Sequence, residues 1–212
     1  MAANYNNSAW FYDSLSRLVY GRALISAQQY LIRYIKPGSN ILIAGGGTGW
    51  ILDEITKLHP AGLHITYVEV AANMITLSQK RNTGANEVLY INNAVENVTL
   101  AHDFDMVITP FLFDNFTDQT LKTVFNHIHA LLKPAGLWLN ADFQLTGKWW
   151  QQFLLKSMFI FFRIVCGIEA SKLPHIESHF TQNSYKPISH KTFFNEFILA
   201  QVYSKQPSSG NN

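Results

Sequence analysis

The chain has 212 residues, of which 48% are hydrophobic and 14% aromatic, so it is long enough to bury a core and too apolar to be intrinsically disordered. Its formal net charge of +2 comes from scattered Lys and Arg residues, which disfavours a nucleic-acid substrate. The single cysteine, Cys166, excludes an intramolecular disulfide and a cysteine-based metal site. The stretch 1–8 has no signal-peptide pattern, so we expect a cytoplasmic protein.

Residues 9–35 are predicted to form an N-terminal helical cap. Apolar side chains recur there at helical spacing, the pattern is broken near Gly21, and Pro37-Gly38 ends the segment. The aromatic residues near its start, which include Tyr12, have two interpretations. They either pack the helix onto a sheet or close over a ligand, and the pattern favours neither.

A buried strand, a glycine turn and a helix follow one another between residues 41 and 58. The apolar run 41–44 predicts the strand, and apolar side chains recur at helical spacing over 51–58. The glycines between them permit a sharp reversal and let a ligand approach the backbone closely. The helix start then offers free N–H groups to a polar or anionic ligand. This unit is typical of a nucleotide-binding α/β sheet.

The glycine spacing separates two kinds of nucleotide site. A dinucleotide fingerprint needs a third glycine at position 50, where the chain has Trp50, which argues against a nucleotide-dependent oxidoreductase. The turn Gly45-x-Gly47-x-Gly49 instead resembles motif I of the class I S-adenosylmethionine (SAM)-dependent methyltransferases. Its sequence, Ala-Gly-Gly-Gly-Thr-Gly, most resembles that of the ubiquinone/menaquinone biosynthesis branch of the family. The chain departs from that family at Ile43, where an acidic residue usually orients the amino-acid end of the cofactor.

The second predicted strand, 63–69, ends in an acidic residue. Glu69 lies where nucleotide-binding sheets place a carboxylate that accepts hydrogen bonds from both ribose hydroxyls. The alternative is a solvated Glu at the strand end. In the family that the glycine turn resembles, apolar residues of the next helix flank the adenine, which makes Val70 and Met74 candidates. A Met at helical spacing is more often an ordinary core residue.

The third predicted strand, 87–91, leads to Asn92-Asn93-Ala94. Family members commonly carry an Asp there that accepts from the adenine amino group. Asn93 matches this position, and its carbonyl can accept the same hydrogen bond. An ordinary Asn-Asn turn is the alternative. The fourth predicted strand, 103–109, is followed by Pro110 at the carboxyl edge of the sheet, where ligands of such sheets bind.

A helix is predicted over 118–132 and a fifth strand over 137–142. The segment between them, Leu132 to Gly136, resembles the Leu-Lys-Pro-Gly-Gly turn of the family, with Ala135 in place of one glycine. The resemblance therefore extends from about residue 11 to residue 143. It implies SAM as the cofactor and the following cofactor-binding residues: Tyr12, Ala44, Gly45, Gly46, Gly47, Gly49, Glu69, Val70, Met74, Asn93, Ala94, Thr109 and Pro110.

Residues 144–184 are expected to form a helical insertion after the fifth strand. The stretch 149–168 is strongly apolar, but Lys156 and Arg163 interrupt it and make it too short to span a membrane. A lid over the substrate pocket is the favoured interpretation, followed by a dimer interface and an amphipathic helix on a membrane surface. Residues 188–194 and 197–203 fit a closing hairpin, and the tail 206–212 is expected to be disordered.

These patterns predict a single domain, 1–212, built on a Rossmann-like seven-stranded sheet. The sheet is mostly parallel, its last strand is antiparallel, and helices cover both faces. The resemblance implies methyl transfer from SAM to a small apolar or aromatic acceptor, by a monomer or homodimer without nucleic-acid partner or bound metal. The alternative is a SAM-binding protein without turnover. Asp114, Asp142 and His175 are candidates for a general base by position alone, and a structural role is favoured for each.

Overall fold

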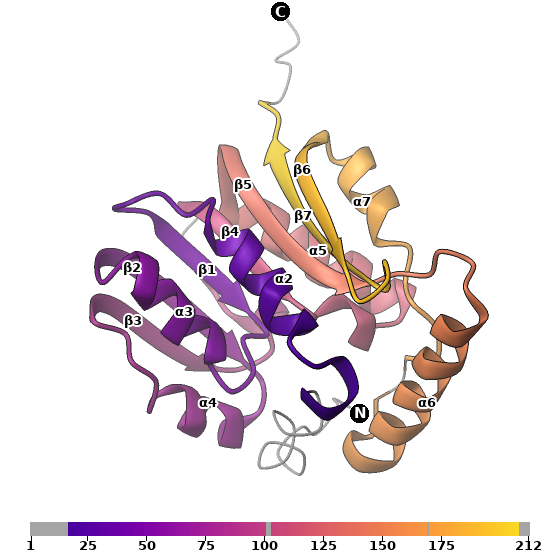
Figure 1. Cartoon of the computed structure of the whole chain (residues 1–212). Helices are drawn as coiled ribbons and strands as arrows, with labels where there is room; N and C mark the ends of the chain where they lie inside the picture. Colours follow the sequence, from indigo (N-terminus) through magenta and orange to yellow (C-terminus); the bar gives the residue numbers. More distant parts are fainter. Residues whose placement is uncertain (1–16, 101–102, 169, 208–212) are drawn as a thin grey trace, which may run out of the picture.

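The computed structural model describes residues 17–100, 103–168 and 170–207 (Figure 1). Tyr12 and the first part of the predicted cap lie outside these residues, as do residues 208–212 of the predicted tail. The described part of the cap is helical at residues 17–20 and again in α2, Ala23–Ile32. Gly21, with a φ of 58°, lies at the break between the two helical stretches, where the apolar pattern predicts an interruption.

Seven strands form one sheet in the order β3-β2-β1-β4-β5-β7-β6. Their bounds are β1 Asn40–Ala44, β2 Ala61–Glu69, β3 Ala85–Asn92, β4 Phe104–Pro110, β5 Leu132–Phe143, β6 Tyr185–Phe193 and β7 Ile198–Lys205. Neighbouring strands from β1 to β5 pair in parallel, whereas β7 pairs antiparallel with both β5 and β6. The predicted Rossmann-like sheet with an antiparallel last strand is confirmed.

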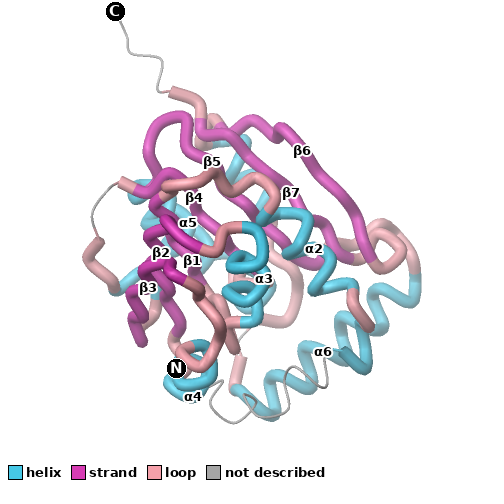
Figure 2. The backbone as a smooth tube through the Cα atoms, turned by 60° about the vertical axis from the view of Figure 1, so that its left-hand side comes forward, coloured by secondary structure: helices cyan, strands magenta, loops and turns pink. Residues whose placement is uncertain are grey.

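Helices cover both faces of this sheet (Figures 1 and 2). Besides α2 they are α3 Trp50–Leu58, α4 Ala72–Ser78, α5 Asp118–Leu131, α6 Trp149–Cys166 and α7 Ile176–Gln182. Side chains alternate along β1: Ile41 and Ile43 pack with α2 and α3, and Leu42 and Ala44 pack with α5. Because β1 is buried on both faces, its sequence is a continuous apolar run.

The segment 132–136 forms the irregular start of β5. The pairing between β4 and β5 shifts register between Leu132 and Leu137, and Ala135 has a φ of 61°. The glycine-like conformation that the family turn implies is therefore present, although an alanine occupies it. The hairpin between β6 and β7 is also tight, since Phe194, Asn195 and Glu196 all have positive φ.

Residues 144–184 lie between β5 and β6 and contain two helices. Helix α7 packs beside α5, with Phe180 buried against Trp138 of β5. Helix α6 stands off the sheet instead (Figures 1 and 2). One side of α6 joins a separate apolar cluster in which Leu155 and Phe159 pack with Tyr20 and Phe197. This arrangement leaves the other side of α6 free of core contacts.

Candidate functional site

A cavity of about 820 Å³ lies at the carboxyl ends of β1, β2 and β4. The turn after β1, the ends of β2 and β4, and the loop after β3 line one part of it. The segment 17–28 and helix α6 line the remainder. Ligands of open α/β sheets bind at this edge, so the cavity is the candidate site.

Nine of the residues predicted to bind a cofactor line this cavity. They lie at the carboxyl ends of β1 to β4, in the last residue of a strand, in the loop after it or, for Met74, in the following helix: Gly45, Gly46, Gly47, Glu69, Val70, Met74, Asn93, Ala94 and Pro110. The topology of the parallel sheet brings these loops together, because the strands β1 to β4 all end at the same edge.

Three predicted residues lie behind the cavity wall. Ala44 is buried in the core beneath the glycine turn. Gly49 is the residue before α3, and a β-carbon there would lie 2.5 Å from that of Ser78. The Thr109 hydroxyl accepts a hydrogen bond from Trp138 Nε1 at 2.9 Å and donates one to Asn140 at 2.8 Å. Ala44 and Gly49 therefore pack against the core, and Thr109 forms buried hydrogen bonds. None of the three lines the cavity, although each is adjacent or close in sequence to a residue that does.

The glycine turn lies directly on the ring of Tyr67. A β-carbon on Gly46 would lie 2.3 Å from two ring carbons of Tyr67, and one on Gly45 would lie 2.7 Å from Leu112. The Tyr67 hydroxyl donates a hydrogen bond to the carbonyl oxygen of Gly47 at 2.9 Å. Residues with side chains at positions 45 and 46 would displace the turn. Tyr67 was not among the predicted site residues, although its position two residues before Glu69 in the predicted strand is visible in the sequence.

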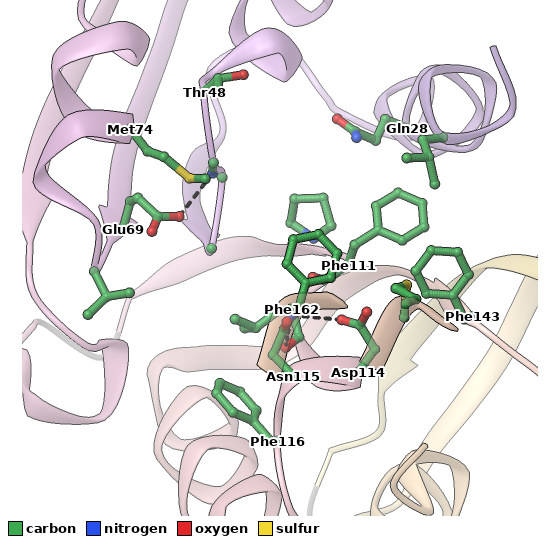
Figure 3. A pocket seen from close by; sticks show the side chains of 18 of the residues that line it. Gln28, Thr48, Glu69, Met74, Phe111, Asp114, Asn115, Phe116, Phe143 and Phe162 are labelled. Atoms are coloured by element: carbon green, nitrogen blue, oxygen red, sulfur yellow. Dashed lines mark hydrogen bonds between the residues drawn. The ribbon is translucent and has the colours of Figure 1, made fainter. Parts of the chain in front are cut away.

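Glu69 connects the glycine turn to the end of β2. Its Oε2 accepts a hydrogen bond from the Gly47 N–H at 3.0 Å, and its Oε1 accepts one from the Ala71 N–H at 2.9 Å. Burial raises the pKa of this carboxyl, and the N–H groups oppose that shift by favouring the charged form. Each carboxylate oxygen has a second lone pair, so Glu69 can accept hydroxyl groups of a ligand while it holds the turn. Figure 3 shows Glu69 and Met74 side by side at the cavity.

The asparagines after β3 have different contacts. The Asn92 side chain donates hydrogen bonds to the carbonyl oxygens of Glu69 and Val70, each at 2.9 Å. Asn93 is exposed on the cavity wall, and its side-chain oxygen accepts from the Ala94 N–H at 2.9 Å. Asn92 therefore ties β3 to the end of β2 beside Glu69. No sequence pattern distinguishes the role of Asn92 from that of Asn93.

The other part of the cavity has aromatic walls. Phe111 follows β4 with a φ of 56°, which is uncommon for a bulky residue, and its ring lies 5.4 Å from that of Phe143. The Tyr20 hydroxyl donates to the Met158 sulfur at 3.4 Å, which connects the segment before α2 to α6. Further lining side chains from this part are Leu154, Phe161 and Phe162 of α6 and Phe116 of the loop after β4. This part suits an apolar or aromatic molecule.

Two buried carboxyls lie at the aromatic part of the cavity. Asp114 lines the cavity, and its Oδ1 accepts from Asn115 Nδ2 at 2.7 Å (Figure 3). Asp142 accepts from the N–H groups of Phe113 and Phe143 at 3.1 and 2.9 Å. Burial raises the pKa of Asp142 to about 7. Burial, together with the charge of Asp142, raises the pKa of Asp114 well above its usual range.

His175, the third candidate for a general base, is remote from this arrangement. It is exposed and does not line the cavity. Its Nδ1 lies 3.5 Å from a carboxylate oxygen of Asp118, at the start of α5. Among the described candidates, only Asp114 therefore faces the space where an acceptor would lie.

Comparisons with known proteins agree with this geometry. Residues 41–136 match a family model described as a methyltransferase domain. Over 127 residues the chain is 29% identical to the malonyl-[acyl-carrier protein] O-methyltransferase of Bacillus cereus, which covers 58% of this chain and 46% of the relative. It is 26% identical over 114 residues to the ubiquinone/menaquinone biosynthesis C-methyltransferase UbiE of Vibrio parahaemolyticus, with 51% and 42% covered. The matches thus span about half the length of these curated relatives.

A solved structure extends the likeness over nearly the whole fold. The Burkholderia thailandensis 1,6-didemethyltoxoflavin-N1-methyltransferase, solved with 1,6-didemethyltoxoflavin and S-adenosylhomocysteine, has a TM-score of 0.65 and 15% identity. The likeness covers 93% of this chain and 84% of that one. At this identity the match shows the fold alone. Together with the family match over residues 41–136 and the glycine turn, this shared fold supports a class I SAM-dependent methyltransferase.

Proposed function

We propose that this protein binds SAM against the glycine turn and transfers its methyl group to a small apolar or aromatic acceptor. The observation that carries the proposal is the position of Glu69, which lies buried at the cavity and accepts from the Gly47 N–H at 3.0 Å. A carboxylate there offers acceptor oxygens to ribose hydroxyls, and the adjoining turn leaves room for a ligand because its glycines have no side chains. The residues present therefore fit SAM.

The residues of the chain then have separate roles in the proposed reaction. Bound SAM would supply an electrophilic methyl group, and the breaking of its sulfur–methyl bond would leave S-adenosylhomocysteine, a neutral thioether. The glycine turn and Glu69 hold the cofactor, while Phe111 and Phe143 hold the acceptor and exclude water. Alignment of two reactants can contribute about 7–11 kcal/mol to the lowering of a barrier. No large charge needs to be stabilised, so orientation is the main contribution of the protein.

Asp114 is the proposed general base where the acceptor carries a hydroxyl group. Its carboxyl lines the cavity among aromatic side chains. A carboxyl with a raised pKa is a stronger base than an ordinary aspartate once it is ionised, so base catalysis by Asp114 would require a pH high enough to ionise it. The similar proteins include an O-methyltransferase and an N1-methyltransferase, so the shared fold does not determine the methylated atom.

Calorimetry with S-adenosylhomocysteine tests the cofactor half of the proposal. We expect micromolar binding by the wild-type protein and at least tenfold weaker binding by Glu69→Ala. Glu87→Gln is the matched control, because Glu87 is an exposed acid on β3 outside the cavity and its loss leaves the affinity unchanged. Absence of binding by the wild-type protein would overturn the proposal.

A second candidate function is SAM binding without turnover. Ile43, which replaces the usual family acid, is completely buried in the core and offers no polar atom to a ligand. The Asn93 carbonyl already accepts from the Ala94 N–H. A panel of phenolic, amine and quinol acceptors with radiolabelled SAM separates the two candidates. Methyl transfer to any of them supports the enzyme, whereas binding without transfer, also in a cell extract, supports the second candidate.

A further inference from the structure

The outer side of α6 carries a stripe of large apolar side chains. Trp149, Phe153, Ile160 and Ile164 are 79%, 69%, 60% and 79% exposed. They are separated by four, seven and four residues, so they lie along one side of the helix. Isolated exposed apolar residues are normal, but four large ones on one side of a helix indicate a surface that meets another apolar phase. We refer to these four residues as the α6 stripe.

Basic residues border the α6 stripe. Lys156 and Arg163 are exposed, and they lie three residues after Phe153 and Ile160 respectively. The sequence from 144 to 168 contains three basic residues and no Asp or Glu. Lys148 forms an ion pair with Glu196 at 2.9 Å, which leaves the border of the stripe to the other two. The exposed side of α6 is therefore apolar along its centre and positively charged at one edge.

The inner side of α6 is already used by the protein. Leu155 and Phe159 are buried in the cluster with Tyr20, and Met158 and Phe162 line the cavity. Helix α6 thus forms a wall between the aromatic part of the cavity and the surface that bears the stripe. No helix in the described part of the chain is long and apolar enough to cross a membrane.

The charge pattern distinguishes between two occupants of the stripe. A second copy of this chain, packed with its α6 antiparallel about a two-fold axis perpendicular to the helix, would place the two Lys156–Arg163 edges side by side, and no acidic residue of α6 would compensate the repulsion. A bilayer with anionic headgroups instead complements the basic edge, while Trp149, Phe153 and the two isoleucines enter the interfacial region. The combination of Trp, Phe and Ile with Lys and Arg is typical of helices that lie in a membrane interface.

We propose that the α6 stripe is a docking surface for an anionic lipid membrane, with α6 lying in the interfacial plane. Docking does not depend on the proposed function. A second consequence rests on the proposed function. Because α6 contacts both the membrane and the aromatic part of the cavity, the acceptor is a lipid-phase molecule that enters the cavity past this helix.

Vesicle co-sedimentation with the full chain tests docking. The probes are phosphatidylcholine vesicles with and without phosphatidylglycerol. We expect the wild-type protein to sediment with the anionic vesicles and to be released by added salt, because the screening of charge shortens the range of attraction. Phe153→Gln and Lys156→Glu should each weaken sedimentation at least tenfold. Leu89→Gln is the control, since Leu89 is an exposed apolar residue on β3 that lies outside α6 and the cavity.

A spectroscopic reading locates the contact. The tryptophan emission of the wild-type protein should shift to shorter wavelength with anionic vesicles, and Trp149→Phe should lose most of that shift. Failure of the wild-type protein to bind anionic vesicles at low salt would overturn the proposal. A dimer that Phe153→Gln dissociates in light scattering would also overturn it, by showing a second copy on the stripe. Calorimetry with S-adenosylhomocysteine separates membrane docking from the proposed function, since Phe153→Gln and Lys156→Glu should both retain cofactor binding.

Discussion

Replacing Asp114 by Asn should change how the stability of this protein depends on pH. Asp114 and Asp142 are both 6% exposed, and the pKa values of both are raised. The Asp114 Oδ1 accepts from Asn115, and the amide oxygen of an Asn can accept the same hydrogen bond. The substitution therefore removes one titrating group and leaves this contact in place.

The size of this change follows from the linkage between proton binding and folding. A carboxyl whose pKa is raised by folding keeps its proton in the folded state at a pH where the unfolded chain has released it. Its contribution to stability is complete below the unfolded pKa and is lost as the pH rises towards the folded pKa. Each such carboxyl lowers the free energy of unfolding by about 1.4 kcal/mol per pH unit. Between pH 5 and pH 7, Asp114→Asn should therefore gain stability relative to the wild-type protein, with an upper limit of about 1.4 kcal/mol per pH unit.

Urea denaturation at pH 5, 6 and 7, followed by circular dichroism, measures this difference. The wild-type curve should fall more steeply with pH than that of Asp114→Asn. Asp118→Asn is the control, because Asp118 is exposed, pairs with Lys172, and has a lowered pKa. Parallel profiles for the wild-type protein and Asp114→Asn would show that Asp114 ionises freely, and the account of the buried carboxyl pair would fail.

Three further substitutions test local features of the fold. Gly46→Ala should lower the free energy of unfolding by about 1–3 kcal/mol, because its β-carbon would lie 2.3 Å from the Tyr67 ring; unchanged urea denaturation would contradict the close contact. Ala135→Gly should raise the unfolding free energy by about 1 kcal/mol, since residue 135 has a φ of 61°, and a loss in thermal stability would refute this. Thr117→Ala should lower the free energy of unfolding by about 1 kcal/mol in urea denaturation, because the Thr117 hydroxyl accepts from the Thr120 N–H at 3.3 Å at the start of α5. Thr117→Ser should retain most of the stability.

The order of strands and helices was legible in the sequence because periodicity is a local property. The apolar run 41–44, the glycines after it and the helical spacing beyond Trp50 each report on the conformation of their own segment. Parallel strands in a Rossmann-like sheet end at one edge, so these local patterns also indicated where a ligand would bind. The positions of Glu69 and Met74 at the cavity were predictable for this reason.

The contacts between segments required the tertiary structure. Nothing in the sequence indicates that Gly46 lies on the Tyr67 ring, that Asn92 rather than Asn93 holds the end of β2, or that Asp114 and Asp142 share a buried environment. Such contacts depend on strand register and on the path of each loop, which are settled by packing over the whole sheet.

Helix α6 likewise combines features that its sequence determined with features that only the tertiary structure decided. Its sequence determined a helix with an apolar side and a few basic residues, and left open a lid, a dimer interface or a membrane surface. The tertiary structure decided which residues meet the cavity, Met158 and Phe162 among them, and which face outwards, Phe153 and Ile160 among them. The physical reason is that side-chain periodicity fixes which residues share a side of a helix, whereas only the packing of distant segments determines which side is buried.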